Sequence, residues 1–239
     1  MEIYAYTLVT DSGFAPAVKD GLLSLACCKT RLRYKIWNQF KNGKTNIFLI
    51  GLSGVQLQKK ITKDISAKDV TYYPFYIARI TDAVSTKEYF DGNSIYASRP
   101  DCQYMLKDDT WWYKNNNPHN PQKGKATVAE KDNIDIFYTA RKGREHQPYD
   151  YNAVLLSEDY CLFGFNQEEP LSPWFKEKIC QVRKKAWRSD RSPLEGIDEE
   201  TFNHFFEKMK EKGFNSVMNR VSGDTVDDYF LKVDCKVTC

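Results

Sequence analysis

The sequence predicts an α+β protein, because segments of strand length fill its first two-thirds and helical spacing of apolar residues is concentrated in its last third. Strands followed by helices are typical of α+β folds rather than of a regular βαβ repeat. We expect a mixed sheet or a partial barrel over residues 1–165 and a helical, basic part over residues 166–239. At 239 residues the chain is long enough for a single domain with a buried core.

Several segments have the pattern of β-strands. Residues 3–9 alternate imperfectly between apolar and polar side chains, and residues 47–52 form a short apolar run. Residues 72–80 are rich in aromatic and β-branched residues, which strands favour. Further strands are expected at residues 135–138, 153–156 and 160–165.

Helices are expected mainly near the C-terminus. Apolar residues recur at helical spacing in residues 173–188 and 198–212, and Gly213 is placed to end the second of these helices. Residues 86–90 have the pattern of the end of a short helix. Polar composition predicts a loop or solvated helix at residues 56–68 and an Asn/Pro/Gly/Lys loop at residues 114–125.

Composition and charge narrow the class of protein. Hydrophobic residues make up 41% of the chain, which excludes global disorder, and there is no apolar run of membrane-spanning length. The N-terminus lacks the pattern of a signal peptide. Seven cysteines, an odd number, indicate reduced thiols, so we expect a cytoplasmic protein that contacts no membrane. Because the net charge is only +3, any affinity for nucleic acid must come from local patches.

Cofactor and metal motifs are absent from the sequence. Gly43-Lys44-Thr45 ends like a phosphate-binding loop, but Asn38 stands where that loop requires a glycine. No dinucleotide-binding glycine pattern follows a strand. Cys27 and Cys28 are adjacent and cannot easily ligate one metal. We therefore expect no cofactor and no metal, which leaves hydrolysis, elimination or binding without chemistry.

The richest tract runs from Thr10 to Arg33 and combines an acid, a Gly-Phe-Ala-Pro turn, two cysteines and a cationic cluster. It predicts a turn followed by a short buried element that ends in this cluster. Asp11 is the best catalytic candidate, since a carboxylate on a braced turn can stabilise a sugar cation or activate water. Spacing alone favours the alternative that Asp11 only caps the turn. Lys29 is a candidate nucleophile or phosphate contact, or simply the solvated end of a buried segment.

This tract also resembles the nucleotide-modification-associated domain families, which are linked to hypermodified DNA bases in phages and bacterial anti-phage loci. The matching positions in the tract are Asp11, Gly13, Phe14, Ala15, Pro16, Gly21, Leu25, Ala26, Cys27, Cys28, Lys29 and Arg33. Weaker matches follow at residues 48–52, 76–80, 88–90, 92–96, 154–157 and 163–164. The resemblance implies modified DNA as the partner, a catalytic role for Asp11, and recognition of a phosphate or carboxylate by Arg33.

Two further features fit contact with a flipped base. Trp111, Trp112 and Tyr113 cannot all face one core, so at least one ring is expected to be exposed and could stack on a base. His119, in the loop that follows, is a candidate mobile acid or base. The alternatives are packing at the root of the loop for the rings and an inert, exposed histidine.

The clearest basic patch lies between residues 176 and 191, where seven basic residues stand against two acidic ones, with Trp187 among them and Trp174 just before. This combination favours contact with a phosphate backbone, and a solvated helical face is the alternative. The residues expected to bind DNA are Arg183, Lys184, Lys185, Arg188 and Arg191.

Together these features predict a protein that acts on modified nucleobases in DNA. The leading hypothesis is a cofactor-independent DNA glycosylase that excises a hypermodified cytosine in anti-phage defence. Asp11 would stabilise the sugar cation or orient water, Lys29 and Arg33 would hold flanking phosphates, and Phe14 would line the base pocket with the ring cluster at residues 111–113. The alternative is a non-catalytic reader of modified bases. An enzyme that installs the modification would need a donor site, which the sequence does not show. No obligate protein partner is expected.

Overall fold

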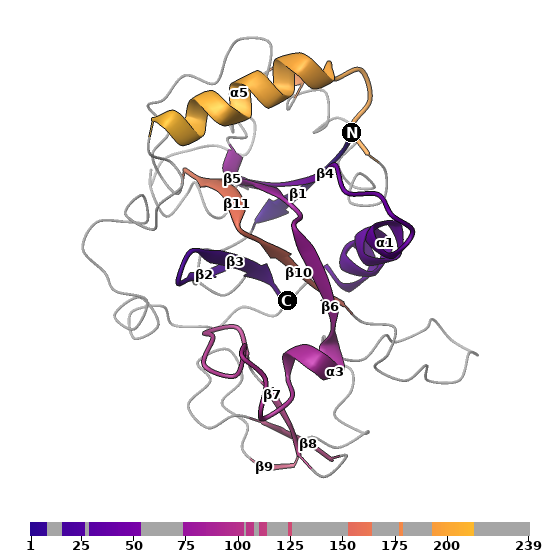
Figure 1. Cartoon of the computed structure of the whole chain (residues 1–239), viewed down its shortest axis with the longest axis vertical. Helices are drawn as coiled ribbons and strands as arrows, with labels where there is room; N and C mark the ends of the chain where they lie inside the picture. Colours follow the sequence, from indigo (N-terminus) through magenta and orange to yellow (C-terminus); the bar gives the residue numbers. More distant parts are fainter. Residues whose placement is uncertain are drawn as a thin grey trace, which may run out of the picture. The chain divides into compact units, whose positions relative to one another are not determined.

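A computed structural model gives the structure of this chain and describes residues 1–8, 16–26, 29–53, 74–102, 104–107, 110–113, 124–125, 153–163, 177–178 and 193–212. The chain forms two compact units, each assembled from segments far apart in the sequence. Unit 1 comprises Met1–Asp11, Lys44–Thr81 and Ser157–Asp224, and unit 2 comprises Ser12–Gly43, Asp82–Leu156 and Thr225–Cys239. The prediction of a single domain stays a prediction. Figure 1 labels the helices and strands.

Unit 1 is built on a four-stranded mixed sheet with the order β1-β4-β5-β11. Its strands are β1 (Glu2–Leu8), β4 (Ile47–Ser53), β5 (Pro74–Arg79) and β11 (Asp159–Leu162). β1 and β4 run parallel, whereas β5 pairs antiparallel with both β4 and β11. A parallel pair cannot be joined by a tight turn, and residues 9–46 supply the long connection here.

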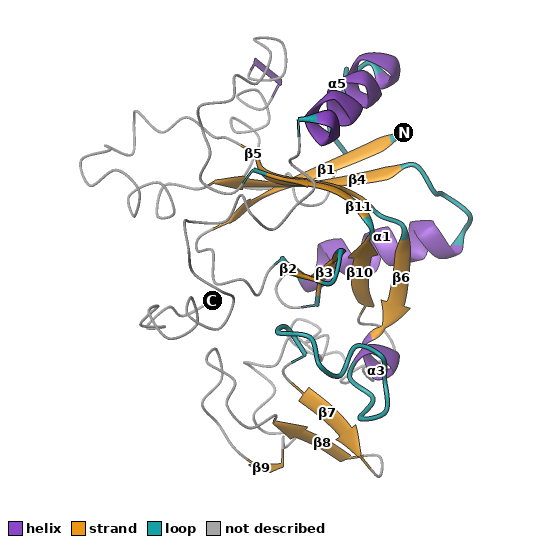
Figure 2. Cartoon of the chain, turned by 60° about the vertical axis from the view of Figure 1, so that its left-hand side comes forward, coloured by secondary structure: helices purple, strands orange, loops and turns teal. Residues whose placement is uncertain are grey.

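Helix α5 (Glu199–Glu211) covers one face of this sheet (Figure 2). Its apolar side chains are spaced three or four residues apart, so they share one side of the helix, and they are buried. They pack against alternate residues of the strands. The helix residues are Phe202, Phe205, Phe206 and Met209, and the strand residues include Ile3, Ala5, Phe48, Ile50 and Ile77. Asp198 begins the helix by accepting a hydrogen bond from the backbone N–H of Thr201 at 2.7 Å.

Charged residues bind the exposed edge of α5 to the sheet. Lys210 Nζ lies 2.6 Å from Asp159 Oδ1 and 3.0 Å from Glu207 Oε2. Arg79 Nη1 lies 3.2 Å from Asp159 Oδ2. Cys161 of β11 lies in the buried core beneath this network, and burial raises the pKa of its thiol to about 12. Cys161 is therefore a packed core residue and not a reactive thiol.

Gly51 interrupts the apolar run of β4 because no side chain fits there. A Cβ at this position would lie 2.2 Å from Tyr76 Cε1 and 2.7 Å from Leu8 Cδ1. The hydroxyl of Tyr76 donates to the hydroxyl of Tyr6 at 2.8 Å, and both rings are buried. The pairing of β4 with β5 shifts register between Gly51 and Leu52, an irregularity that a glycine within a strand commonly marks.

Unit 2 contains a four-stranded sheet with the order β2-β3-β10-β6. Its strands are β2 (Ala17–Lys19), β3 (Leu22–Leu25), β6 (Asp82–Ser85) and β10 (Ala153–Ser157). β2 and β3 form an antiparallel hairpin whose two-residue turn is Asp20-Gly21. Both turn residues have positive φ, 52° and 76°, as a type I′ turn requires.

Helix α1 (Thr30–Lys41) lies against β6 in unit 2 (Figure 2). Leu32, Ile36 and Phe40 are spaced four residues apart, and the first two are buried. The sequence interpretation expected only a short buried element and a cationic cluster here, so the helix is a correction. The basic residues between the apolar ones obscured the helical spacing of the apolar side chains in the sequence.

The remaining elements of unit 2 are short. Helix α3 (Thr86–Tyr89) confirms the helix expected at residues 86–90, and the hydroxyl of Ser85 caps it by accepting the N–H of Glu88 at 3.1 Å. A three-stranded antiparallel sheet joins β7 (Tyr104–Lys107), β8 (Thr110–Tyr113) and β9 (Gly124–Lys125). Gly124 and Lys125 were expected to end a loop. That expectation is wrong, because they pair with Tyr113 and Trp112.

The predicted α+β class is confirmed, with a mixed sheet in the N-terminal part and α5 near the C-terminus. Strands expected at 47–52 and 153–156 match β4 and β10 within one residue. Several other expectations lie outside the described residues: the strand at 135–138, the segment at 56–68, Gly213, and all of 173–188 except the helical residues 177–178. Among the described residues, no helix is both long enough and apolar enough to cross a membrane.

Candidate functional site

The tract from Pro16 to Arg33 passes from the β2–β3 hairpin into α1 through a strained residue. Lys29 has a left-handed backbone conformation, with φ 53° and ψ 35°, and its carbonyl oxygen accepts the N–H of Arg33 at 2.9 Å. This conformation costs a residue with a side chain about 1 kcal/mol, so it persists only where surrounding structure demands it. The half-buried lysine stands at the positive end of the helix dipole, and the first turn carries no acid.

Arg33 lies one helical turn beyond Lys29 and is fully buried. Its Nη1 donates to the carbonyl oxygen of Ala153 in β10. A guanidinium stays charged in a protein, and burying it requires acceptors of this kind. The bond therefore fixes α1 to the sheet of unit 2. The predicted role of Arg33 in binding a phosphate or carboxylate stays a prediction.

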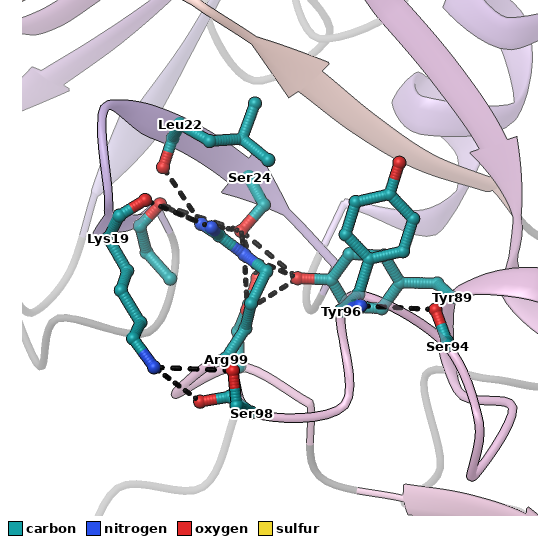
Figure 3. A network of polar contacts seen from close by, with 10 residues as sticks. Lys19, Leu22, Ser24, Tyr89, Ser94, Tyr96, Ser98 and Arg99 are labelled. Atoms are coloured by element: carbon teal, nitrogen blue, oxygen red, sulfur yellow. Dashed lines mark hydrogen bonds and ion pairs between the residues drawn. The ribbon is translucent and has the colours of Figure 1, made fainter.

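A second buried arginine, Arg99, binds the β2–β3 hairpin (Figure 3). Its Nη1 donates to the carbonyl oxygen of Lys19 at 3.1 Å, and its Nη2 to those of Leu22 at 2.8 Å and Ala17 at 3.3 Å. Lys19 Nζ in turn donates to the carbonyl oxygen of Ser98 at 3.0 Å. The planar fork of the guanidinium thus satisfies three carbonyls around one tight turn.

Asp101 completes a buried polar cluster with Ser24, Tyr89 and Arg99, which we call the Arg99 cluster. The Tyr89 hydroxyl donates to Asp101 Oδ1 and the Ser24 hydroxyl to Asp101 Oδ2, both at 2.7 Å. Arg99 Nε donates to Tyr89 at 3.1 Å and to Ser24 at 3.2 Å, and it lies 3.8 Å from Asp101 Oδ1. Each hydroxyl therefore both donates to the acid and accepts from the arginine.

The electrostatics of this cluster favour positioning over proton transfer. Burial raises the pKa of the Asp101 carboxyl, and Arg99, Tyr89 and Ser24 oppose that rise. Burial also raises the pKa of the Tyr89 hydroxyl far above its usual range, and the charge of Asp101 adds to the rise. A hydroxyl held neutral and already bonded is a poor nucleophile, whereas a fully satisfied polar network rigidifies its surroundings. The cluster locks residues 89–101 to the hairpin.

Tyr96 adds an aromatic surface next to this cluster. Its ring stacks on that of Tyr89, with centroids 4.8 Å apart and an angle of 16° between the planes (Figure 3). The neighbouring Ile95 is 85% exposed. The turn before it is fixed by a hydrogen bond at 2.8 Å from the backbone N–H of Asn93 to Asp91 Oδ1. The loop therefore presents these side chains from a braced backbone.

Residues 1–219 match the family model described as nucleotide modification associated domain 2. The chain belongs to this family. The match spans every described residue of both units and confirms the resemblance inferred from the N-terminal tract. The family description associates the domain with nucleotide modification. No curated protein and no solved structure matches the chain.

In this member of the nucleotide modification associated domain 2 family, the structure describes only part of the predicted site. Lys29 and Arg33 are brought together at the start of α1. Strand β8 contains Trp111, Trp112 and Tyr113, and the backbone of Trp112 is paired with that of Met105 in β7. The other predicted residues lie outside the described ones: Asp11, Phe14, His119, Arg183, Lys184, Lys185, Arg188 and Arg191. The functional roles predicted for all of these residues stay predictions.

The Arg99 cluster escaped the sequence reasoning because its members are up to 77 residues apart. Neither apolar periodicity nor a short motif marks such a set. The available signal was modest: the polar residues Ser98, Arg99 and Asp101 follow one of the segments that carried the family resemblance. Within the described ranges, no group of three or more His, Cys, Asp or Glu residues could hold a metal ion.

Proposed function

We propose that this protein acts on modified nucleobases in DNA, and specifically that it is a glycosylase that excises a hypermodified cytosine during anti-phage defence. The observation that carries the proposal is the match of residues 1–219 to a family associated with nucleotide modification. The reaction needs no cofactor: water adds to C1′ of the deoxyribose, the C1′–N1 bond breaks, and the base leaves with a proton derived from water.

Asp11 supplies the chemistry in this proposal. A carboxylate next to C1′ stabilises the positive charge that develops on the sugar as the glycosidic bond breaks, or orients the attacking water. Lys29 holds a phosphate beside the flipped nucleotide, in keeping with its place at the positive end of α1. His119 would give its proton to the leaving base and regain one from the attacking water, and Phe14 with residues 111–113 would line the base pocket.

Arg33 enters the proposal as a positioning residue. Its guanidinium is buried and bonded to the Ala153 carbonyl oxygen, so it orients the first turn of α1 and with it Lys29. This differs from the direct phosphate contact that the resemblance implies. Burial is the physical reason, since a phosphate would have to leave water to reach the side chain.

A second candidate is a reader that binds a modified base without chemistry. One observation favours it: the hydroxyls and the acid of the Arg99 cluster are engaged with one another. Such a cluster supports a rigid binding surface. The reader would use the same basic and aromatic residues but would not depend on Asp11.

Purified protein incubated with modified DNA separates the two candidates. The substrates are matched duplexes with unmodified, hydroxymethylated or glucosylated cytosine, without added metal or cofactor. Mass spectrometry detects released base, and alkaline cleavage detects abasic sites. We expect free modified base and alkali-labile strands, both abolished in Asp11→Asn while binding persists. Selective binding without release would support the reader, and loss of neither property in Asp11→Asn would exclude the glycosylase mechanism. If the protein neither binds nor cleaves modified DNA, the proposed substrate class is wrong.

A further inference from the structure

One side of α1 carries an uncommon combination of cations and aromatic rings. Residues 21–63 contain nine basic residues and no Asp or Glu, although the chain has 32 acidic residues in all. Helix α1 lies inside this acid-free stretch. Its buried stripe is formed by Leu32, Arg33 and Ile36. At 100° per residue, Tyr34 and Lys41 project away from this stripe, and Trp37 lies between them and the stripe, so the three form a continuous ridge.

Contacts along this ridge are close. The rings of Tyr34 and Trp37 have centroids 5.8 Å apart with an angle of 35° between their planes. Lys41 Nζ lies 4.0 Å from the centroid of the Trp37 ring, a cation–π contact. Lys41 is exposed, and both rings are half-buried. The ridge therefore presents a charged tip and two aromatic faces together.

Trp37 also carries a buried polar group. Among the residues that the structure describes, none accepts a hydrogen bond from its indole N–H. Tryptophan usually finds a partner for this donor when it is buried, and leaving it unsatisfied costs about 1–3 kcal/mol. A buried donor of this kind in a native structure is commonly explained by a bound water or ion.

We infer that the Tyr34–Trp37–Lys41 ridge of α1 binds the phosphodiester backbone of DNA. The inference rests on the proposed function and deepens it, because it names a surface of the protein that holds the DNA backbone. Lysine and tyrosine are common donors to phosphate oxygens, and aromatic faces pack against sugars and unstacked bases. Helix α1 itself carries no carboxylate, so none of its own side chains repels a phosphate. This surface is separate from the basic patch predicted at residues 176–191.

Charge variants at Lys41 test this inference directly. Binding of a labelled, unmodified duplex is measured by fluorescence anisotropy from about 50 mM to about 200 mM salt. Lys41→Gln should lower the slope of log affinity against log salt by about 1, and Lys41→Glu should weaken binding about tenfold at low salt. Lys41→Arg, which keeps the charge, should bind like the natural protein.

The matched control is Lys208→Gln, which removes one charge from the exposed side of α5. It should leave the salt slope unchanged, and circular dichroism of each variant should show an intact fold. If Lys41→Gln and Lys208→Gln lower the salt slope equally, binding depends on the total charge of the protein and not on the ridge, and the inference is overturned. Unchanged duplex binding in Lys41→Glu would overturn it, as would binding to anionic phospholipid vesicles in preference to DNA.

The outcome is separable from that of the proposed function. Because backbone contact is independent of base identity, loss of unmodified duplex binding in Lys41→Glu supports the inference even when no base is released from any substrate. Conversely, release of modified base at an unchanged rate and affinity by Lys41→Glu supports the glycosylase and contradicts the ridge.

Discussion

Arg99 and Asp101 are two residues apart and form a buried ion pair, with Arg99 Nε 3.8 Å from Asp101 Oδ1. The pair is shared with two hydroxyl groups, those of Ser24 and Tyr89, which donate to the acid. Arg99 also donates hydrogen bonds to three backbone carbonyl oxygens of the β2–β3 hairpin. One ion pair therefore joins a loop to a hairpin that leads directly into the predicted site tract.

Replacing Asp101 with Asn should destabilise the protein by about 2 kcal/mol. The amide keeps one oxygen acceptor where the acid has two, so either Ser24 or Tyr89 loses its acceptor inside the protein. Urea denaturation measures the free energy of unfolding. Glu195→Gln, at an exposed acid, is the control and should change stability little. An equal, small effect of both substitutions would show that the Arg99 cluster contributes nothing to stability.

The same acid should make stability depend on pH. Burial raises the pKa of Asp101 in the folded state, so the folded protein holds this proton more tightly than the unfolded chain does. The free energy of unfolding should therefore fall as pH rises from about 3.9 through the raised pKa. Thermal unfolding across this range tests the sign. The stability advantage over Asp101→Asn should shrink as pH rises, and an advantage that grows with pH would contradict the burial effect.

Gly51→Ala should destabilise unit 1 by about 3 kcal/mol. The added Cβ would lie 2.2 Å from a ring carbon of Tyr76, which is fully buried and cannot move without displacing its neighbours. Gly43→Ala is the control, because Gly43 has a positive φ of 83° and open space around it, whereas Gly51 has the close contacts without a positive φ. Strain alone should cost Gly43→Ala about 1 kcal/mol. Chemical denaturation of the two variants separates steric overlap from backbone strain, and similar costs would rule out the overlap.

Two substitutions at Lys29 separate its backbone strain from its side chain. Lys29→Ala and Lys29→Gly both remove the ammonium group, but only glycine adopts φ 53° without strain. Lys29→Gly should therefore be more stable than Lys29→Ala by about 1 kcal/mol in thermal or urea unfolding. Both should lose DNA binding equally if Lys29 contacts a phosphate. If Lys29→Gly binds DNA better than Lys29→Ala, in the same order as their stabilities, Lys29 has a structural role instead.

Local patterns in the sequence were sufficient for several elements. The apolar run at residues 47–52 predicted β4, and the spacing of Phe202, Phe206 and Met209 predicted α5, because both depend on neighbours along the chain. The motifs of the N-terminal tract were likewise sufficient for the family. Two local signals were missed: the Asp20-Gly21 turn and the four-residue apolar spacing of α1.

Tertiary structure decided which strands pair and which charged residues are buried. β1 and β4 are parallel neighbours although residues 9–46 separate them, and no local pattern specifies that pairing. The sequence analysis predicted a phosphate or carboxylate contact for Arg33 and did not single out Arg99. Both are buried because backbone carbonyls far along the chain accept their hydrogen bonds. The sequence by itself determined β4, α5 and the family, since these depend on short-range pattern. Burial of charge depends on acceptors that only the folded chain brings within reach.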